Sequence, residues 1–255
     1  MADLRYNTLI IIEGENREKS FFTKLCELIS VDKNTTIIPF CNDIYELYKK
    51  IEELDFNTTT LDVILKYVNI DDELREKLKT TKFVNTYLVF DLDLQNDSED
   101  KQAENLNKVC KMIELFNDET GYYGKLFVNY PMMESYRHFL FSNCDTLKNK
   151  LIEAKNEILT NYKSISGQEG STKNIKSFGL HEYNVICKAH LMQANLLLNK
   201  TFKKPNLKQY EQIIDIKNIH KEQSAHILNE KTMFVLNTSS YIYSEFYPQI
   251  LRSKN

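Results

Sequence analysis

The chain has 255 residues, a formal net charge of −3, 42% hydrophobic and 27% charged residues, and only 6 Gly and 4 Pro. This composition excludes collagen-like and linker-rich chains, and it contains too many apolar residues for a disordered protein. The charge is not basic enough to indicate nucleic-acid binding by itself, so any such binding would need a local patch. The length allows one large domain or two small ones.

Neither a membrane span nor a disulfide framework is expected. The longest apolar run, around Leu9 to Ile12, is far shorter than the roughly 20 residues that cross a bilayer, and the polar N-terminal residues do not resemble a signal peptide. We therefore expect a cytoplasmic protein without membrane contact. The five cysteines are an odd number without a CxxC pair, which argues against disulfides and structural zinc and predicts reduced core residues.

The first 130 residues alternate between short apolar runs and amphipathic stretches. The runs lack polar alternation, which is typical of parallel strands buried on both faces. The stretches between them repeat apolar residues with a helical period. The pattern predicts a doubly wound α/β unit, with strands at Thr8–Ile12, Thr35–Phe40, Thr86–Phe90 and Lys125–Asn129 and helices at Glu18–Ser30 and Glu99–Phe116.

The remaining segments are predicted to be mostly helical. Residues 43–80 hold three helix candidates, Ile44–Leu54, Thr60–Val68 and Asp71–Leu78, of which the later two form a helical insertion at about 55–80. The C-terminal region is predicted to contain helices at Cys144–Tyr162, Leu180–Leu198, Leu207–Ile216, Asn218–Asn229 and Ser240–Leu251, with a mobile loop at Ser164–Lys173. The expected division is an α/β domain at 1–142 and a helical region at 143–255.

Acidic residues follow three of the predicted strands. Glu13 comes directly after the first, Asp91 and Asp93 follow the third, and Glu134 lies just past the fourth. Ligands bind at the carboxyl ends of strands in open parallel sheets, and residues i and i+2 of an extended segment share a face. A single such carboxylate is usually a helix cap or a turn residue. Three together favour an oxygen-rich site for Mg²⁺ or Mn²⁺ rather than zinc.

Three segments resemble a known family. Ile12-Glu-Gly-Glu-Asn-Arg-Glu-Lys-Ser-Phe-Phe22 resembles the opening motif of Toprim domains, with the spacing of the RloB-like branch. Phe90-Asp-Leu-Asp93 resembles the DxD motif of that group, and Asn129-Tyr-Pro-Met-Met-Glu-Ser-Tyr-Arg-His-Phe139 resembles its third block. The resemblance covers about residues 8–140. The chain departs from the usual pattern at Arg17, where Thr is more common, and by the additional Tyr130.

The resemblance implies a Toprim-like, Rossmann-like parallel sheet with a divalent-metal site. By position, Glu13 would be a metal ligand or general base, Asp91 and Asp93 would be metal ligands, and Glu18 and Glu134 would be supporting catalytic acids. The implied reaction is metal-dependent hydrolysis of a phosphodiester in DNA or in RNA such as tRNA. A strand-transfer reaction would need a nucleophilic tyrosine on a separate domain, which the chain does not visibly contain.

The family also implies a biological setting. Stand-alone Toprim proteins of this kind are commonly found in bacterial anti-phage or abortive-infection systems beside an ABC-type ATPase, which predicts a toxic nuclease effector with an ATPase partner. The alternative is a non-catalytic Toprim-like adaptor or regulatory subunit of such a complex. Aromatic residues near the C terminus suit either the core or a homodimer interface.

Two further residue groups are candidates for substrate contact. Arg137 and His138 follow Glu134, and we expect them to contact phosphate or transfer a proton, although a lone histidine is more often a packed residue. Lys203 and Lys204 belong to the most basic stretch and could bind a nucleic-acid backbone, although a solvated charged run is the commoner explanation.

Overall fold

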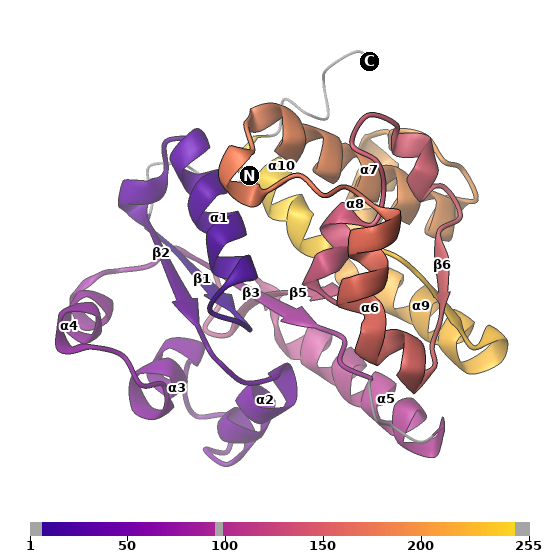
Figure 1. Ribbon diagram of the computed structural model, residues 1–255. Coiled ribbons are helices and arrows are strands. Elements are labelled where there is room, and N and C mark those ends of the chain that lie inside the picture. The colour runs from indigo at the N-terminus through magenta and orange to yellow at the C-terminus, as the bar shows by residue number, and fades with distance from the viewer. Residues whose placement is uncertain (1–6, 95–98, 248–255) are drawn as a thin grey trace.

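The computed structural model describes residues 7–94 and 99–247 and contains a five-stranded sheet flanked by helices (Figure 1). The sheet has the order β2 (Thr35–Pro39), β1 (Thr8–Ile12), β3 (Asn85–Asp91), β5 (Gly124–Asn129) and β4 (Asn117–Asp118). The first four strands in this order run parallel, and β4 is an antiparallel edge strand. The predicted α/β class is confirmed, and the arrangement is compatible with a Rossmann-like fold.

The parallel strands form because their apolar runs can be covered on both faces. All five residues of β1 are buried, and Leu9 to Ile12 have no exposed surface. Two helices of the first half, α1 (Arg17–Leu28) and α5 (Glu99–Leu115), contact β2 and β5 respectively. Three short helices, α2 (Ile44–Glu52), α3 (Thr60–Tyr67) and α4 (Asp72–Thr80), follow β2, and the later two occupy the predicted insertion.

The second half is mostly helical but includes one antiparallel pair of short strands. Its helices are α6 (Asn156–Glu169), α7 (Leu180–Asn199), α8 (Leu207–Ile214), α9 (Ile216–Glu230) and α10 (Tyr241–Phe246). The strands β6 (Leu151–Glu153) and β7 (Thr232–Phe234) pair antiparallel. Short 3-10 turns occur at Asp32–Asn34 (η1), Met133–Arg137 (η2), Cys144–Leu147 (η3), Ile175–Ser177 (η4) and Thr238–Ser240 (η5).

Two predictions for this half are wrong. The predicted helix Cys144–Tyr162 is broken into η3, β6 and the start of α6, because Ile152 turns inward from a strand paired with β7. The predicted loop Ser164–Lys173 begins as the last turns of α6, where Ser166 is fully buried. Residues 248–251 of the last predicted helix lie outside the described residues.

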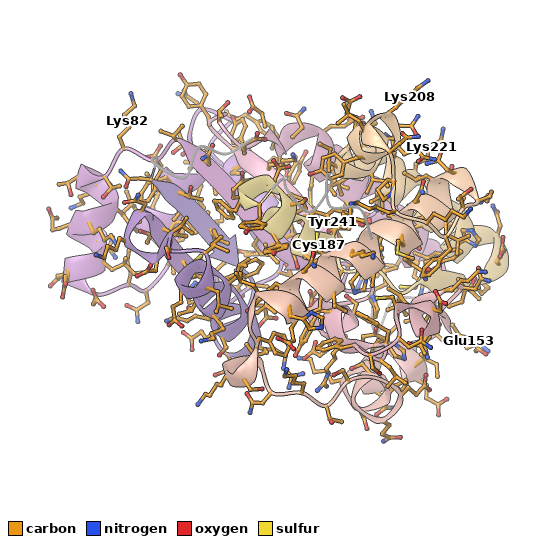
Figure 2. The ribbon with its side chains drawn as sticks, turned by 90° about the horizontal axis from the view of Figure 1, so that it is seen from above. Lys82, Glu153, Cys187, Lys208, Lys221 and Tyr241 are labelled. Carbon is orange, nitrogen blue, oxygen red and sulfur yellow. The ribbon has the colours of Figure 1, made fainter. Side chains whose placement is uncertain are left out.

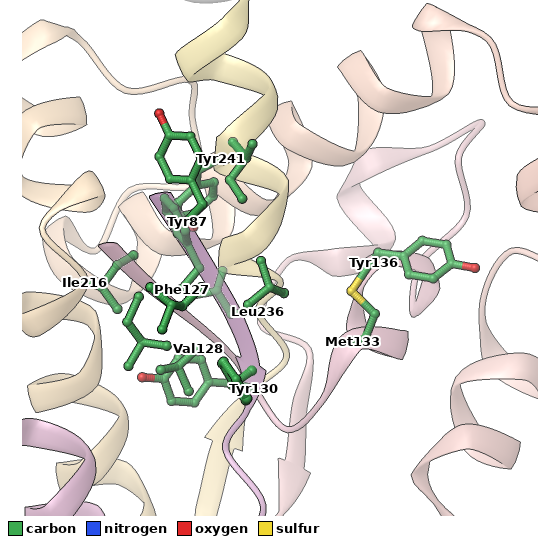
Figure 3. Packing of buried hydrophobic residues seen from close by; sticks show 14 of the residues in the cluster. Tyr87, Phe127, Val128, Tyr130, Met133, Tyr136, Ile216, Leu236 and Tyr241 are labelled. Atoms are coloured by element: carbon green, nitrogen blue, oxygen red, sulfur yellow. The ribbon is translucent and has the colours of Figure 1, made fainter. Parts of the chain in front are cut away.

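One continuous hydrophobic cluster includes residues from both halves of the chain. Figure 3 shows Tyr87, Phe127 and Val128 of the sheet beside Leu236 and Tyr241 of the C-terminal segment. Hydrogen bonds reinforce this contact, since the Tyr130 and Leu236 backbones bond to each other at 2.8 and 2.9 Å. The C-terminal segment therefore supports the strand that leads to the third sequence block.

The interior also contains two of the five cysteines. Cys26 and Cys187 are buried, and Cys187 lies near Tyr241 in the middle of the molecule (Figure 2). Cys41 is exposed, so the expectation that all five are core residues is wrong at that position. Among the described residues, no helix combines the length and the apolar character needed to cross a membrane.

Candidate metal and phosphate site

The carboxyl ends of β1, β3 and β5 meet at one edge of the sheet, because these strands are parallel neighbours. Glu13 follows β1 directly, Asp91 ends β3, and Asn129 ends β5 opposite Asp91. The apolar strand residues hold the backbone rigidly, and the polar residues begin where the strands leave the core. This is the edge at which open parallel sheets bind ligands.

Hydrogen bonds join the three strand ends. The backbone N–H of Asp91 donates to Oε2 of Glu13 at 2.9 Å. The side-chain amide of Asn129 donates to Oδ1 of Asp91 at 3.3 Å. The structure therefore brings Glu13 and Asp91 together, with Asn129 as a neutral third member that sequence reasoning did not select.

The carboxylates at this edge destabilise one another as anions. Burial raises the pKa of Glu13 to about 7, against the hydrogen bond from Asp91, and the charges of Asp93, Glu18 and Asp43 raise it further. Burial, followed by the charge of Glu13, raises the pKa of Asp91 well above its ordinary value. A bound cation would relieve this repulsion, and carboxylate oxygens are the ligands that Mg²⁺ prefers. The donor set thus fits a hard divalent ion.

The side chains are not arranged as a complete cage. Within residues 7–94 and 99–247, no group of three or more His, Cys, Asp or Glu side chains is placed to hold a metal ion. The Glu13 carboxylate is turned onto the Asp91 backbone, and Glu134 is turned toward Arg17. Metal binding would therefore require these side chains to change rotamer.

Asp93 does not share a strand face with Asp91 as predicted. The strand β3 ends at Asp91, and Asp93 has a φ of 52°, in the left-handed region. The extended geometry on which the i, i+2 argument depends has therefore stopped before Asp93. Its charge still acts on Glu13, so it lies near the cluster by way of a turn.

Glu134 and Glu18 lie beside the cluster and are accompanied by cations. Glu134 is 4% exposed, and its Oε1 lies 3.1 Å from Nη1 of Arg17 and 3.9 Å from Nζ of Lys163. Burial raises the pKa of Glu18, with the charge of Glu134 acting in the same direction and those of Lys163 and Arg17 opposing it. Two cations thus border the carboxylates, where they could also contact a phosphate.

Arg137 and His138 make their side-chain hydrogen bonds to α6 and not to this cluster. His138 is fully buried, with Nδ1 2.9 Å from the Tyr162 hydroxyl and Nε2 3.0 Å from Glu169. Arg137 donates from Nη2 to the Lys163 carbonyl at 2.9 Å. Burial lowers the pKa of His138. Both side chains join η2 to α6, and neither is brought to the carboxylates.

Lys203 and Lys204 lie in the connection between α7 and α8. The Lys203 carbonyl accepts a hydrogen bond from Asn195 at 2.9 Å, which fixes this connection on α7. Burial lowers the pKa of Lys204, and the charge of Lys188 acts in the same direction. Neither lysine lines the hollow that adjoins the carboxylates.

That hollow is a cleft of about 680 Å³ between α2 and α5, here called the α2–α5 cleft. It was not predicted from the sequence, although lysines recur on α5 with helical spacing. Asp43, the N-cap of α2, was also missed, and it both lines the cleft and acts on Glu13. The lining residues are Asp43, Tyr45, Tyr48, Lys49, Glu52, Asp93, Lys101, Asn105, Lys108, Lys111 and Met112.

The chain was compared with models of protein families, with curated protein sequences and with solved structures, and none of the three comparisons gave a match.

Proposed function

We propose that the chain is a divalent-metal-dependent nuclease of the Toprim type, which hydrolyses phosphodiester bonds in DNA or RNA. The observation that supports this most is the convergence of Glu13 and Asp91, on neighbouring strand ends, with Asp93 near them. The three belong to the segments that resemble Toprim motifs. Clustered carboxylates at this edge of a parallel sheet suit the binding of Mg²⁺ or Mn²⁺.

The proposed roles follow from the positions of the side chains. Glu13, Asp91 and Asp93 would hold the ion, which when bound neutralises phosphate charge and makes water more acidic. Arg17 is placed to orient the phosphate, because its guanidinium borders the cluster, donates to Glu134 at 3.1 Å and has further N–H groups that suit a phosphate. Glu134 holds Arg17 in this position.

The supporting acids and the remaining candidates have narrower roles in this proposal. Glu18 lies over Gly14, since its carboxylate would be 2.9 Å from a methyl group added there. It is therefore close enough to the cluster to hold a water or a proton. His138 and Arg137 act by fixing η2, which carries Glu134, against α6.

The biological part of the proposal depends on the resemblance over residues 8–140. It assigns the chain to a bacterial anti-phage or abortive-infection system, as a toxic effector with an ABC-type ATPase partner. The second candidate is a non-catalytic Toprim-like adaptor in such a complex. The observation that favours it is the salt bridge between Arg17 and Glu134, which occupies an acidic residue of the site.

Cleavage assays separate the two candidates. Purified protein would be incubated with supercoiled DNA, single-stranded DNA and total tRNA in Mg²⁺, Mn²⁺ or EDTA, beside the variants Glu13→Gln and Asp91→Asn. The control is Glu211→Gln, at an exposed position of α8. Cleavage that needs metal and is lost only in the two site variants supports the nuclease. A folded protein that cuts none of the substrates and is harmless when expressed would refute it and favour the adaptor.

A further inference from the structure

The α2–α5 cleft adjoins the carboxylates and is built from two helical faces. Asp43 and Asp93 line the cleft, and both are near enough to Glu13 to raise its pKa by their charge. One part of the cleft therefore borders the strand ends. In Figure 1, α2 and α5 are both drawn on the side of the sheet toward which β1 and β2 point.

The α5 side of the cleft consists of exposed lysines with uncharged, buried side chains between them. Lys101, Lys108 and Lys111 are exposed, whereas Asn105 and Met112 are buried between them. Ten residues of helix at about 1.5 Å each span roughly 15 Å, a length over which a nucleic-acid strand presents several phosphates. Lys108 pairs with Glu104, and this ion pair is exposed at both side chains, so Glu104 is easily exchanged for another anion.

The α2 side of the cleft is aromatic. Tyr45 and Tyr48 are one helical turn apart, half-buried, and both line the cleft. The Tyr48 ring makes an edge contact with the Phe56 ring, with ring centroids 6.0 Å apart. Lys49 and Glu52 complete this wall. Lysines opposite aromatic rings are the combination that binds single strands, because phosphates meet the cations and unpaired bases stack on the rings.

We propose that the α2–α5 cleft binds a single-stranded segment of nucleic acid and leads it to the carboxylates. The inference rests on the proposed function and names its substrate class. A hollow of about 680 Å³ lies within the range of roughly 300–1,000 Å³ that holds compact ligands, so it admits unpaired nucleotides rather than a double helix. The α5 lysines contact phosphates, and the two tyrosines contact bases. Asp43 and Asp93 lie at the end of the cleft nearest Glu13. Their negative charges would repel a phosphate there unless a cation were bound with it.

Binding would be measured without cleavage. Fluorescently labelled 12-nucleotide single strands of DNA and of RNA, and a DNA duplex of equal length, would be titrated with the Glu13→Gln protein in Mg²⁺ at several salt concentrations. On this background, Lys108→Glu/Lys111→Glu is compared with Lys208→Glu/Lys221→Glu, which makes the same change in net charge at two exposed lysines at the periphery (Figure 2).

The cleft variant should bind single strands at least ten-fold more weakly than the control. The slope of log affinity against log salt should also fall by about 1.4, since each phosphate contact contributes about 0.7. Tyr48→Leu should weaken binding at least five-fold. Its control, Tyr122→Leu, alters a ring that is 81% exposed and should have no effect.

Equal binding by the cleft and control variants, tighter binding of the duplex, or no binding of any single strand would overturn the inference. Circular dichroism of each variant confirms that it is folded. The binding and cleavage results are independent of each other. If single strands bind through the cleft but the wild-type protein cleaves nothing, the proposed nuclease function is refuted and the proposed binding role of the cleft is retained. If the cleft substitutions leave the cleavage rate unchanged, the nuclease function is retained and the proposed binding role of the cleft is refuted.

Discussion

Glu13→Gln should stabilise the metal-free protein and, on the proposed function, should abolish cleavage. Burial raises the pKa of Glu13 from 4.5 to about 7, so the folded state holds a proton that the unfolded state has lost. A raised carboxyl pKa makes the folded state less stable as the pH rises from about 4.5 to about 7, and the full cost remains above that window. Glutamine keeps an oxygen that can accept the Asp91 N–H and carries no charge.

The size of the effect follows from the shift. A change from 4.5 to about 7 is 2.5 units, and at about 1.4 kcal/mol per unit the cost of ionised Glu13 is roughly 3 kcal/mol above pH 8. At pH 5 the same two values leave only about 1 kcal/mol. At about 2 °C per kcal/mol for a chain of this length, the variant should melt roughly 6 °C higher at pH 8 and about 2 °C higher at pH 5.

Thermal unfolding in EDTA at the two pH values measures this difference. The control is Glu211→Gln, which removes an exposed carboxylate from α8 and should leave the melting temperature unchanged. Added Mg²⁺ should narrow the gap by stabilising the wild type, because ligands of the native state raise its stability. A gain that is equal at both pH values, or a variant that melts below the wild type at pH 8, would refute the electrostatic reasoning.

Three further changes test other contacts. Arg17→Ala should lower the free energy of unfolding by about 1–3 kcal/mol in urea titrations, because it leaves the buried Glu134 with a more distant cation. Gly170→Ala should cost at least roughly 2–4 kcal/mol, because its methyl carbon would lie 2.0 Å from a backbone carbonyl oxygen of η2. Burial lowers the pKa of His190 to about 3, so stability should fall below pH 6.5 by up to about 1.4 kcal/mol per unit, and His190→Gln should flatten that part of the profile.

Each of these changes has a matched control. Arg17→Lys retains the cation and should recover part of the loss. Gly167→Ala is the control for Gly170→Ala. Its added methyl carbon would lie 3.4 Å from the Arg137 guanidinium, which is an ordinary van der Waals contact with a flexible side chain. His181→Gln alters an exposed histidine and should leave the acid limb of the profile as it is. Equal losses in a variant and its control would contradict the contact assigned to that residue.

The parallel sheet could be predicted because its strands are covered on both faces. Runs such as Leu9–Ile12 admit few alternatives, and their burial is complete. The strands β4 and β6 could not be predicted, because each is only two or three residues long. β4 is the edge strand of the main sheet, and β6 pairs with β7, which is distant in the sequence. Short strands of this kind carry too little periodic signal to be distinguished from turns.

Glycine and serine misled the prediction near residue 167. Ser164–Lys173 has the composition of a loop, but in the structure its first part is helical because small residues allow η2 to lie close to α6. A carbon added at Gly170 would overlap the Arg137 backbone, so this glycine serves a close approach rather than flexibility. Composition alone cannot distinguish these two uses of glycine.

Most acidic residues of the candidate site could be predicted from the sequence, whereas its cationic residues and Asp43 could not. Glu13 and Asp91 follow recognisable strands, so the sheet edge brings them together. The partner of Glu134 is Arg17, 117 positions earlier in the chain, and no local pattern connects the two. The α2–α5 cleft depends in the same way on how two helices are placed, which the sequence period of either helix does not specify.

The end of β5, which carries Asn129, is hydrogen-bonded by residues that the ribosome adds much later. Thr238 donates to the Val128 carbonyl at 2.7 Å, and the Ser239 backbone N–H donates to Oδ1 of Asn129 at 3.3 Å, across 110 positions. Ribosomes add roughly 5–20 residues per second, so a nascent chain carries Asn129 for about 5–20 seconds before these donors exist. On the proposed function, activity at this edge would therefore be delayed relative to the synthesis of its acidic residues, and a newly made chain would pass through an interval before it could act.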